Sequence, residues 1–293
     1  MDCTPMRSML FVPADSERKL AKAQGSQADA LILDLEDAVA PSQKPAARQA
    51  AAQYLQSQGE QSKARLFVRI NPLDSGLALD DLAAVLVPGL SGIMLPKVRG
   101  AADVQLLSHY LDALEVRAGL VPGSVRIVPV ATETAASMLT MTSYASTPLP
   151  RLAGVTWGAE DLSTAIGAIS NREDDGALSP LYTMAQSMCL CVAGVSGVAA
   201  IDTLYADFRD ADGLMAACRL SRRRGFGGRI AIHPDQVEVI NAAFTPSDAE
   251  RQAAQRIVDA FDAQPDAGVV SIDGAMYDIP HLKQARRTLG QRA

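Results

Sequence analysis

Short apolar runs alternate with helix-like segments eight times along this chain. The eight runs are three to five residues long and most of them stop at a polar side chain. They are Met9–Val12, Ala30–Leu33, Leu66–Ile70, Gly92–Leu95, Ile127–Ala131, Gly154–Trp157, Val198–Ile201 and Ile230–Ile232. Strand–helix alternation is typical of a parallel sheet, and eight units predict closure into an α/β fold, the (β/α)₈ TIM barrel. An open doubly wound sheet is the alternative. Pro129 argues against a regular fifth strand, because proline cannot donate to a ladder.

The last part of the chain exceeds what a barrel needs. We expect the barrel in residues 1–244 and a C-terminal extension in residues 245–293. Thr245 as N-cap, followed by Pro246, predicts a helix start, and Asp273-Gly274 predicts a hairpin. A final amphipathic helix is expected over His281–Leu289. This helix–hairpin–helix extension could cover a barrel mouth, either its own or that of a neighbouring subunit.

Composition and charge argue against several classes of function. The chain has 48% hydrophobic and 20% charged residues and a formal net charge of −6, which disfavours a nucleic-acid or membrane-surface role. No apolar stretch reaches the roughly 18–20 residues of a membrane span. The N-terminus lacks a secretory layout, and the four cysteines show no disulfide pattern. We therefore expect a cytoplasmic protein.

Polar side chains follow almost every apolar run. They are Asp34, Glu36, Asp37, Arg69, Asn71, Lys97, Glu133, Glu160, Asp161, Asp202 and His233. In a (β/α)₈ barrel, the C-terminal ends of the strands converge on one mouth, which holds the active site. Residues of both charge signs at so many strand ends predict one shared site.

Glu133 and Asp161 follow the fifth and sixth runs, so they would lie on neighbouring strand ends. Two carboxylates with waters and substrate oxygens suit Mg²⁺. Neither His nor Cys lies at these two ends, which disfavours zinc or copper. The alternative is that each carboxylate pairs with an Arg or Lys or caps the next helix, as Asp161 could do.

A second acidic group comprises Asp34, Glu36 and Asp37 after the second run. Its carboxylates could hold the water shell of the metal. The alternative is a set of salt bridges to Lys44 and Arg48 on the following helix.

Two cations and one imidazole complete the candidate site. Arg69 could bind a carboxylate or stabilise an oxyanion, and Lys97 is similar. The alternative for both is charge balance for the acidic groups. His233 could act as a base, or together with Pro234 it could form a wall of the mouth.

Nine segments of the chain carry a resemblance to a known family. They are RSMLFVPADSERKLAKA, ADALILDLEDAV, FVRINP, GIMLPKV, ATETA, WGAEDL, DTLYADFRD, GFGGRIAIHPDQVEVINAAFTPS and DGAMYDIPHLKQARRTL. In order and spacing, over nearly the whole chain, they resemble the citrate lyase beta-subunit and malyl-CoA lyase family. The resemblance implies a (β/α)₈ barrel, usually in a homotrimer or hexamer. It also implies Mg²⁺-dependent carbon–carbon cleavage of a 3-hydroxyacyl thioester.

The resemblance also assigns residues to roles. The family's metal ligands fall on Glu133 and Asp161, its arginine on Arg69, and its DLED acidic segment on Glu36 and Asp37. A catalytic carboxylate that reaches a neighbouring subunit falls on Asp278. Coenzyme A contacts fall near Phe11, Arg18, Lys22 and the His233-Pro234 segment, and Lys97 is a further candidate for binding substrate.

The chain departs from the family pattern at two positions. Ala14 stands where many members have Gly, and Thr132 stands where an aliphatic residue usually precedes the Glu. Neither change removes a proposed ligand, but both weaken assignment to a subgroup. The expected reaction is cleavage of citramalyl-, malyl- or citryl-CoA to an α-keto acid and acetyl-CoA. The alternatives are a CoA-independent pyruvate aldolase and a partner-dependent beta subunit that binds an acyl-carrier thioester.

Overall fold

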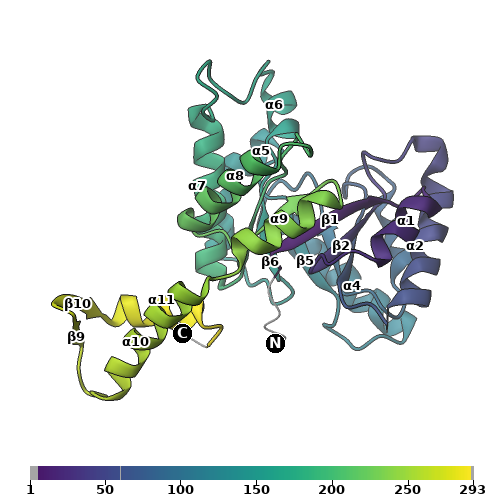
Figure 1. Cartoon of the computed structure of the whole chain (residues 1–293). Helices are drawn as coiled ribbons and strands as arrows, with labels where there is room; N and C mark the ends of the chain where they lie inside the picture. Colours follow the sequence, from purple (N-terminus) through teal and green to yellow (C-terminus); the bar gives the residue numbers. More distant parts are fainter. Residues whose placement is uncertain (1–5, 60, 292–293) are drawn as a thin grey trace. The chain divides into compact units, whose positions relative to one another are not determined.

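The computed structural model describes residues 6–59 and 61–291. Within them, residues 6–244 form one compact unit and residues 245–291 form a second. The first unit contains an eight-stranded parallel sheet with helices between the strands (Figure 1).

The eight strands run in the order β5-β4-β3-β2-β1-β8-β7-β6. Their bounds are β1 Ser8–Pro13, β2 Ala30–Asp34, β3 Arg65–Arg69, β4 Gly92–Leu95, β5 Arg126–Pro129, β6 Gly154–Thr156, β7 Ala199–Asp202 and β8 Gly228–Ala231. Two isolated parallel bridges, Ile127 to Leu152 and Val130 to Thr156, join the outer strands β5 and β6. The sheet is therefore a nearly closed barrel, and the (β/α)₈ prediction is confirmed.

Pro129 is compatible with this barrel because of where its nitrogen faces. The backbone N–H groups of Ile127 and Ala131 point toward the β6 segment, where they donate to the carbonyls of Arg151 (2.9 Å) and Thr156 (2.8 Å). Alternate residues of a strand face the same neighbour, so the nitrogen of Pro129 also faces β6. The missing donor therefore falls where β5 and β6 pair only through bridges.

Strand alternation divides the core into two layers. Alternate side chains fill the barrel interior, including Met9, Ile32, Phe67, Met94, Val128, Ile201 and Ile230. The intervening side chains, among them Leu10, Leu31, Leu33, Val68 and Ile93, pack outward in the larger cluster that includes the helices. Both faces of each strand are thus buried, as expected for parallel strands.

Nine α-helices connect or follow these strands in the described residues. They are α1 Glu17–Gln24, α2 Lys44–Gln58, α3 Ala78–Val85, α4 Ala101–Ala118, α5 Ala135–Thr140, α6 Glu160–Ile166, α7 Pro180–Ser196, α8 Ala211–Arg224 and α9 Asp235–Phe244. Short 3₁₀ turns span η1 Pro41–Gln43 and η2 Met141–Ala145. Across the described residues, we find no helix with both the length and the apolarity to cross a membrane.

Helix α6 decides one alternative for Asp161. Its N-cap is Ala159, and Asp161 lies inside the first turn. The suggestion that Asp161 caps the helix is therefore wrong. A carboxylate in the first turn still interacts favourably with the positive end of the helix dipole.

The second unit is a helix–hairpin–helix. Helix α10 spans Asp248–Asp262, strands β9 Val269–Ile272 and β10 Ala275–Asp278 pair antiparallel, and helix α11 spans Ile279–Thr288. Its own small core contains Val258, Phe261, Val270 and Leu282. That this unit covers the mouth of a neighbouring subunit stays a prediction.

Two local signals in this unit had different outcomes. Asp273 (φ 53°) and Gly274 (φ 80°) both adopt the left-handed conformation that a two-residue hairpin needs. The proposed N-cap at Thr245 was wrong, because α10 begins later. Ser247 caps it, in a reciprocal pair with Glu250.

Candidate active site

The register of β2 and β3 places Asp34 directly beside Arg69. The guanidinium binds this carboxylate with two hydrogen bonds, Nε to Oδ1 and Nη2 to Oδ2, both of 2.7 Å. Asp34 also accepts from the backbone N–H of Glu36 (3.0 Å), which fixes the turn after β2. The ring of Phe11 covers the face of Arg69 at 4.6 Å.

Glu36 joins this pair to a second cation. Its Oε2 lies 2.9 Å from Nη1 of Arg69, and its Oε1 lies 2.6 Å from Nζ of Lys97. The residue is only 2% exposed. Burial raises the pKa of Glu36 despite the opposing effect of the two cations. Arg69 lies between two carboxylates, and although burial alone would lower its pKa, the bonds to Asp34 raise it.

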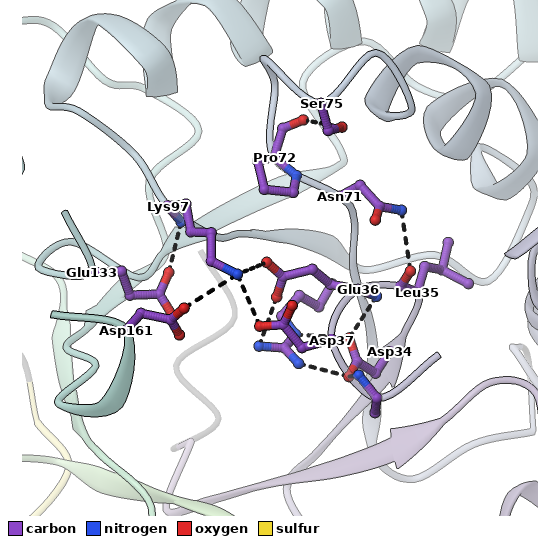
Figure 2. A network of polar contacts seen from close by, with 12 residues as sticks. Asp34, Leu35, Glu36, Asp37, Asn71, Pro72, Ser75, Lys97, Glu133 and Asp161 are labelled. Atoms are coloured by element: carbon purple, nitrogen blue, oxygen red, sulfur yellow. Dashed lines mark hydrogen bonds and ion pairs between the residues drawn. The ribbon is translucent and has the colours of Figure 1, made fainter. Parts of the chain in front are cut away.

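Lys97 contacts four of the carboxylates in the candidate site. Its ammonium lies 2.6 Å from Glu36, 2.9 Å from Asp37 and 3.3 Å from Asp161. Its backbone N–H donates to Oε2 of Glu133 at 2.6 Å. Figure 2 shows the lysine side chain running between Glu133 and Asp161 on one side and Glu36 and Asp37 on the other. The residue has a φ of 50°, a left-handed conformation that is uncommon outside glycine and points to a constrained site.

Glu133 is the most perturbed carboxylate of the cluster. It is 5% exposed, and burial, reinforced by repulsion from Asp161 and Glu36, raises its pKa to about 8. Five carboxylates gather here around two cations, Arg69 and Lys97. The cluster therefore contains more carboxylates than cations. The imbalance is greatest around Glu133, because its carboxylate is hydrogen-bonded to a backbone amide.

A divalent cation suits this donor set. Glu133 and Asp161 both lie beside Lys97, as Figure 2 shows, and oxygen donors are what Mg²⁺ prefers. Across residues 6–59 and 61–291, no group of three or more His, Cys, Asp or Glu side chains could hold a metal. Glu133 and Asp161 would hold such an ion together with water and substrate oxygens.

Gly158 makes room for the buried glutamate. A Cβ at this position would lie 2.8 Å from Cγ and 3.2 Å from Oε1 of Glu133. The β6 end can therefore approach Glu133 only because residue 158 has no side chain. Sequence reasoning missed this residue, although an isolated glycine at a strand end signals close approach of another group.

Lys44 and Arg48 do not form the salt bridges considered for the acidic group. Nζ of Lys44 binds the backbone carbonyls of Leu35 (2.9 Å) and Glu36 (3.0 Å) and Oδ1 of Asn71 (2.6 Å). Arg48 pairs instead with Asp80 and Asp81, on α3. That alternative was wrong, since the acidic group pairs with Arg69 and Lys97, while Lys44 binds its backbone.

Asp202 does not belong to the mouth, contrary to the expectation of a single shared site. It is buried on the outer side of the wall, where it accepts from Nε1 of Trp157 (2.6 Å) and pairs with Arg229. It lines a cavity of about 680 Å³ between β7, α7 and α8, which Glu160 also lines. Alternation along β7 turns Asp202 away from the interior that Ile201 fills.

Among the described residues, no hydrogen bond, ion pair or ring contact joins the remaining sequence-predicted residues of the barrel to the carboxylate cluster. Arg18 and Lys22 are exposed on α1. His233 stacks on Phe208 with ring centroids 4.6 Å apart, and Pro234 follows it, half-buried. A role for these four in binding coenzyme A stays a prediction.

Asp278 lies in the second unit and has a structural role there. Its side chain caps α11 by accepting from the backbone N–H of His281, and its carboxylate lies 2.5 Å from the imidazole of that residue. The bond to His281 lowers the pKa of Asp278. Its proposed catalytic role stays a prediction.

The chain is similar in sequence and fold to several known proteins. Residues 7–234 match the family described as HpcH/HpaI aldolase/citrate lyase. The chain is 37% identical over 289 residues to a (3S)-malyl-CoA thioesterase of Cereibacter sphaeroides, covering 98% of this chain and 94% of that protein. It is 34% identical over 293 residues to the mitochondrial citramalyl-CoA lyase of Rattus norvegicus, covering 96% and 84%.

A solved structure extends the likeness to three dimensions. It is CitE from Mycobacterium tuberculosis in complex with magnesium, acetoacetate and coenzyme A. The TM-score is 0.78 at 32% sequence identity, with 98% of each chain covered. The match over most of the barrel, the relatives above 30% identity and the shared fold lead to one conclusion: this chain belongs to the HpcH/HpaI aldolase/citrate lyase family.

Proposed function

We propose that this protein is a Mg²⁺-dependent lyase that cleaves a 3-hydroxyacyl-CoA thioester to an α-keto acid and acetyl-CoA. Family membership and the citramalyl-CoA lyase and citrate lyase beta-subunit relatives make it an oxo-acid lyase. The observation that carries the proposal is the buried Glu133 beside Asp161, in a cluster with too few cations. The solved relative with magnesium and coenzyme A supports the choice of metal and ligand.

In this proposal, Glu133 and Asp161 hold the metal, and Glu36 and Asp37 orient its waters. When bound, Mg²⁺ would supply Lewis-acid chemistry, acidifying the substrate hydroxyl and holding the oxygens of the keto acid. The hydroxyl would then pass its proton to a water held by Glu36 and Asp37, while its C–O bond becomes the keto carbonyl and the adjacent C–C bond breaks. The electron pair of that bond passes to the thioester as an enolate.

Arg69 is placed to stabilise the charge that develops in this step. Its two hydrogen bonds to Asp34 engage two of the five guanidinium N–H groups, and Glu36 contacts Nη1 as an ion pair, so N–H groups remain for a substrate oxyanion. Because Phe11 and two carboxylates fix the guanidinium, it is organised before substrate arrives. Lys97, which contacts both acidic groups, would bind a substrate oxygen or the waters between them.

The enolate carbon must then gain a proton. We assign this step to Asp278, supplied by the C-terminal unit of a neighbouring subunit in a homotrimer or hexamer. In the reverse direction the same carboxylate would remove that proton. A coenzyme A thioester would extend past Phe11 toward Arg18, Lys22 and the His233-Pro234 segment. The expectation of a cytoplasmic enzyme is part of this proposal.

Thioester hydrolysis is the second candidate, because relatives at 37% identity are malyl-CoA thioesterases. The two reactions differ in products: cleavage gives an α-keto acid and acetyl-CoA, whereas hydrolysis gives the free hydroxy acid and CoA. The CoA-independent aldolase and the partner-dependent beta subunit remain further alternatives. The latter has support from the citrate lyase beta subunit of Haemophilus influenzae, which is 32% identical.

The experiment is a product assay on malyl-, citramalyl- and citryl-CoA, with Mg²⁺ and with EDTA. Metal-dependent formation of an α-keto acid and acetyl-CoA from one thioester is expected. Release of free CoA without a keto acid would favour the thioesterase. If no thioester is turned over and CoA does not raise the melting temperature, the lyase proposal fails in favour of the aldolase or the partner-dependent subunit.

A further inference from the structure

The two strands that lead to the proposed metal ligands are the ones that close the barrel. Glu133 follows β5 and Asp161 follows β6, and these strands are joined by isolated bridges. We call this junction the seam, residues 127–133 facing residues 151–158. Pro129 cannot donate across it, so the ladder has a gap just before the candidate site.

Thr132 spans the seam beyond this gap. The residue is fully buried, and its Oγ1 accepts a hydrogen bond from the backbone N–H of Gly158 at 3.2 Å. The same oxygen lies 3.4 Å from the carbonyl oxygen of Gly158, to which it can donate. One hydroxyl therefore stands in for a pair of ladder hydrogen bonds between the two strand ends.

The position of this link gives it a role at the site. Thr132 directly precedes Glu133, and Gly158 is the residue against which Cγ of Glu133 packs. Gly158 also lies three residues before Asp161. A shift of the β6 end would therefore change the space around Glu133 and the place of Asp161 together.

We propose that Thr132 is a positioning residue, whose hydroxyl fixes the β6 end against β5 so that Glu133 and Asp161 hold the spacing that a shared metal ion requires. This inference rests on the proposed function, since it concerns the same metal. An aliphatic residue at position 132 would fill the space without making the hydrogen bond. It would leave the N–H of the half-buried Gly158 without that partner.

The chain provides a matched control on the facing strand. Thr156 is also a buried threonine, 2% exposed, and within the described residues its hydroxyl has no hydrogen-bond partner. Thr132→Val and Thr156→Val each replace a buried hydroxyl by a methyl group of similar size. Only the first should loosen the seam, and Thr132→Ser should restore it.

Two measurements test the proposal. In metal-free protein, amide hydrogen exchange at Gly158 should become about tenfold faster in Thr132→Val and stay near wild type in the other two variants. Mg²⁺ affinity measured by calorimetry should fall about 10–100-fold in Thr132→Val, the usual effect of removing a group that orients a metal ligand. Thr156→Val should bind Mg²⁺ as the wild type does.

The outcomes separate this proposal from the proposed function. Unchanged exchange at Gly158 in Thr132→Val would overturn the seam link. Faster exchange with unchanged Mg²⁺ affinity would overturn the positioning role while leaving the lyase proposal intact. If the wild type itself binds no Mg²⁺, the proposed function fails, and the positioning role fails with it.

Discussion

The pKa of Glu133 predicts how metal binding depends on pH. Burial and the nearby carboxylates of Asp161 and Glu36 raise this pKa to about 8. Only the ionised carboxylate is a good metal ligand, so below pH 8 Mg²⁺ must displace a proton from Glu133. The apparent affinity should therefore rise about tenfold per pH unit up to pH 8 and then level off. Between pH 6 and pH 9 the change should be about 100-fold, or ~2.7 kcal/mol.

The raised pKa of Glu133 also predicts how the stability of the metal-free protein depends on pH. The pKa of Glu133 in the folded state lies above that of an unfolded glutamate, about 4.3. The contribution of protonated Glu133 to the free energy of unfolding is thus complete below pH 4.3 and is lost as pH rises through 8. The loss should approach about 1.4 kcal/mol per pH unit within that window. Added Mg²⁺ should restore stability above pH 8, because it binds the folded state.

Calorimetry in two buffers with different protonation enthalpies would measure the linkage. We expect about one proton released per Mg²⁺ at pH 6.5 and almost none at pH 9. Glu133→Gln is the control, because it should release no proton and bind Mg²⁺ weakly at every pH. A dissociation constant that does not change between pH 6 and pH 8, without proton release, would refute the argument that burial keeps Glu133 protonated.

Three further predictions concern single side chains. Arg69→Ala should lower kcat/KM by about 10²–10³, or ~3–4 kcal/mol, if the guanidinium stabilises the oxyanion; a loss below about tenfold would remove it from the mechanism. Gly158→Ala should weaken Mg²⁺ binding at least about tenfold, because the new Cβ would lie 2.8 Å from Cγ of Glu133; equal titration curves for variant and wild type would contradict this. Asp278→Asn should keep the melting temperature, since Asn caps helices as well as Asp, but lower kcat by about 10²–10⁴ if this carboxylate transfers the proton. A variant with wild-type turnover would assign Asp278 to capping alone.

Local sequence patterns predicted the main elements well. The eight apolar runs fall on the eight strands, and Asp273-Gly274 forms the hairpin turn. These features depend on neighbours within a few residues, so the sequence contains the necessary information. The exact start of a helix was harder to predict where several neighbouring residues can act as the N-cap. The α10 cap lies at Ser247 rather than Thr245, because Ser247 also has Glu250 three residues later to complete the capping box.

Only part of the candidate site could be predicted from the sequence. The carboxylates Glu133 and Asp161 were identified by their place after apolar runs, and the structure brings both to Lys97. The pairing of Arg69 with Asp34, 35 residues away, depends on the register of two strands. The left-handed conformation of Lys97 likewise has no local signal, since lysine does not favour it.

The sequence by itself determined the order of strands and helices and the polar character of the strand ends. The tertiary structure decided which polar ends share a site, as the contrast between Asp34 and Asp202 shows. Both end a buried strand, yet Asp34 lies in the barrel mouth with Arg69 and Asp202 lies outside the wall with Arg229. Parallel strands are apolar on both faces, so their sequence does not mark the inner side. Because side chains alternate with a period of two, a difference of one residue in position reverses the direction of the carboxylate.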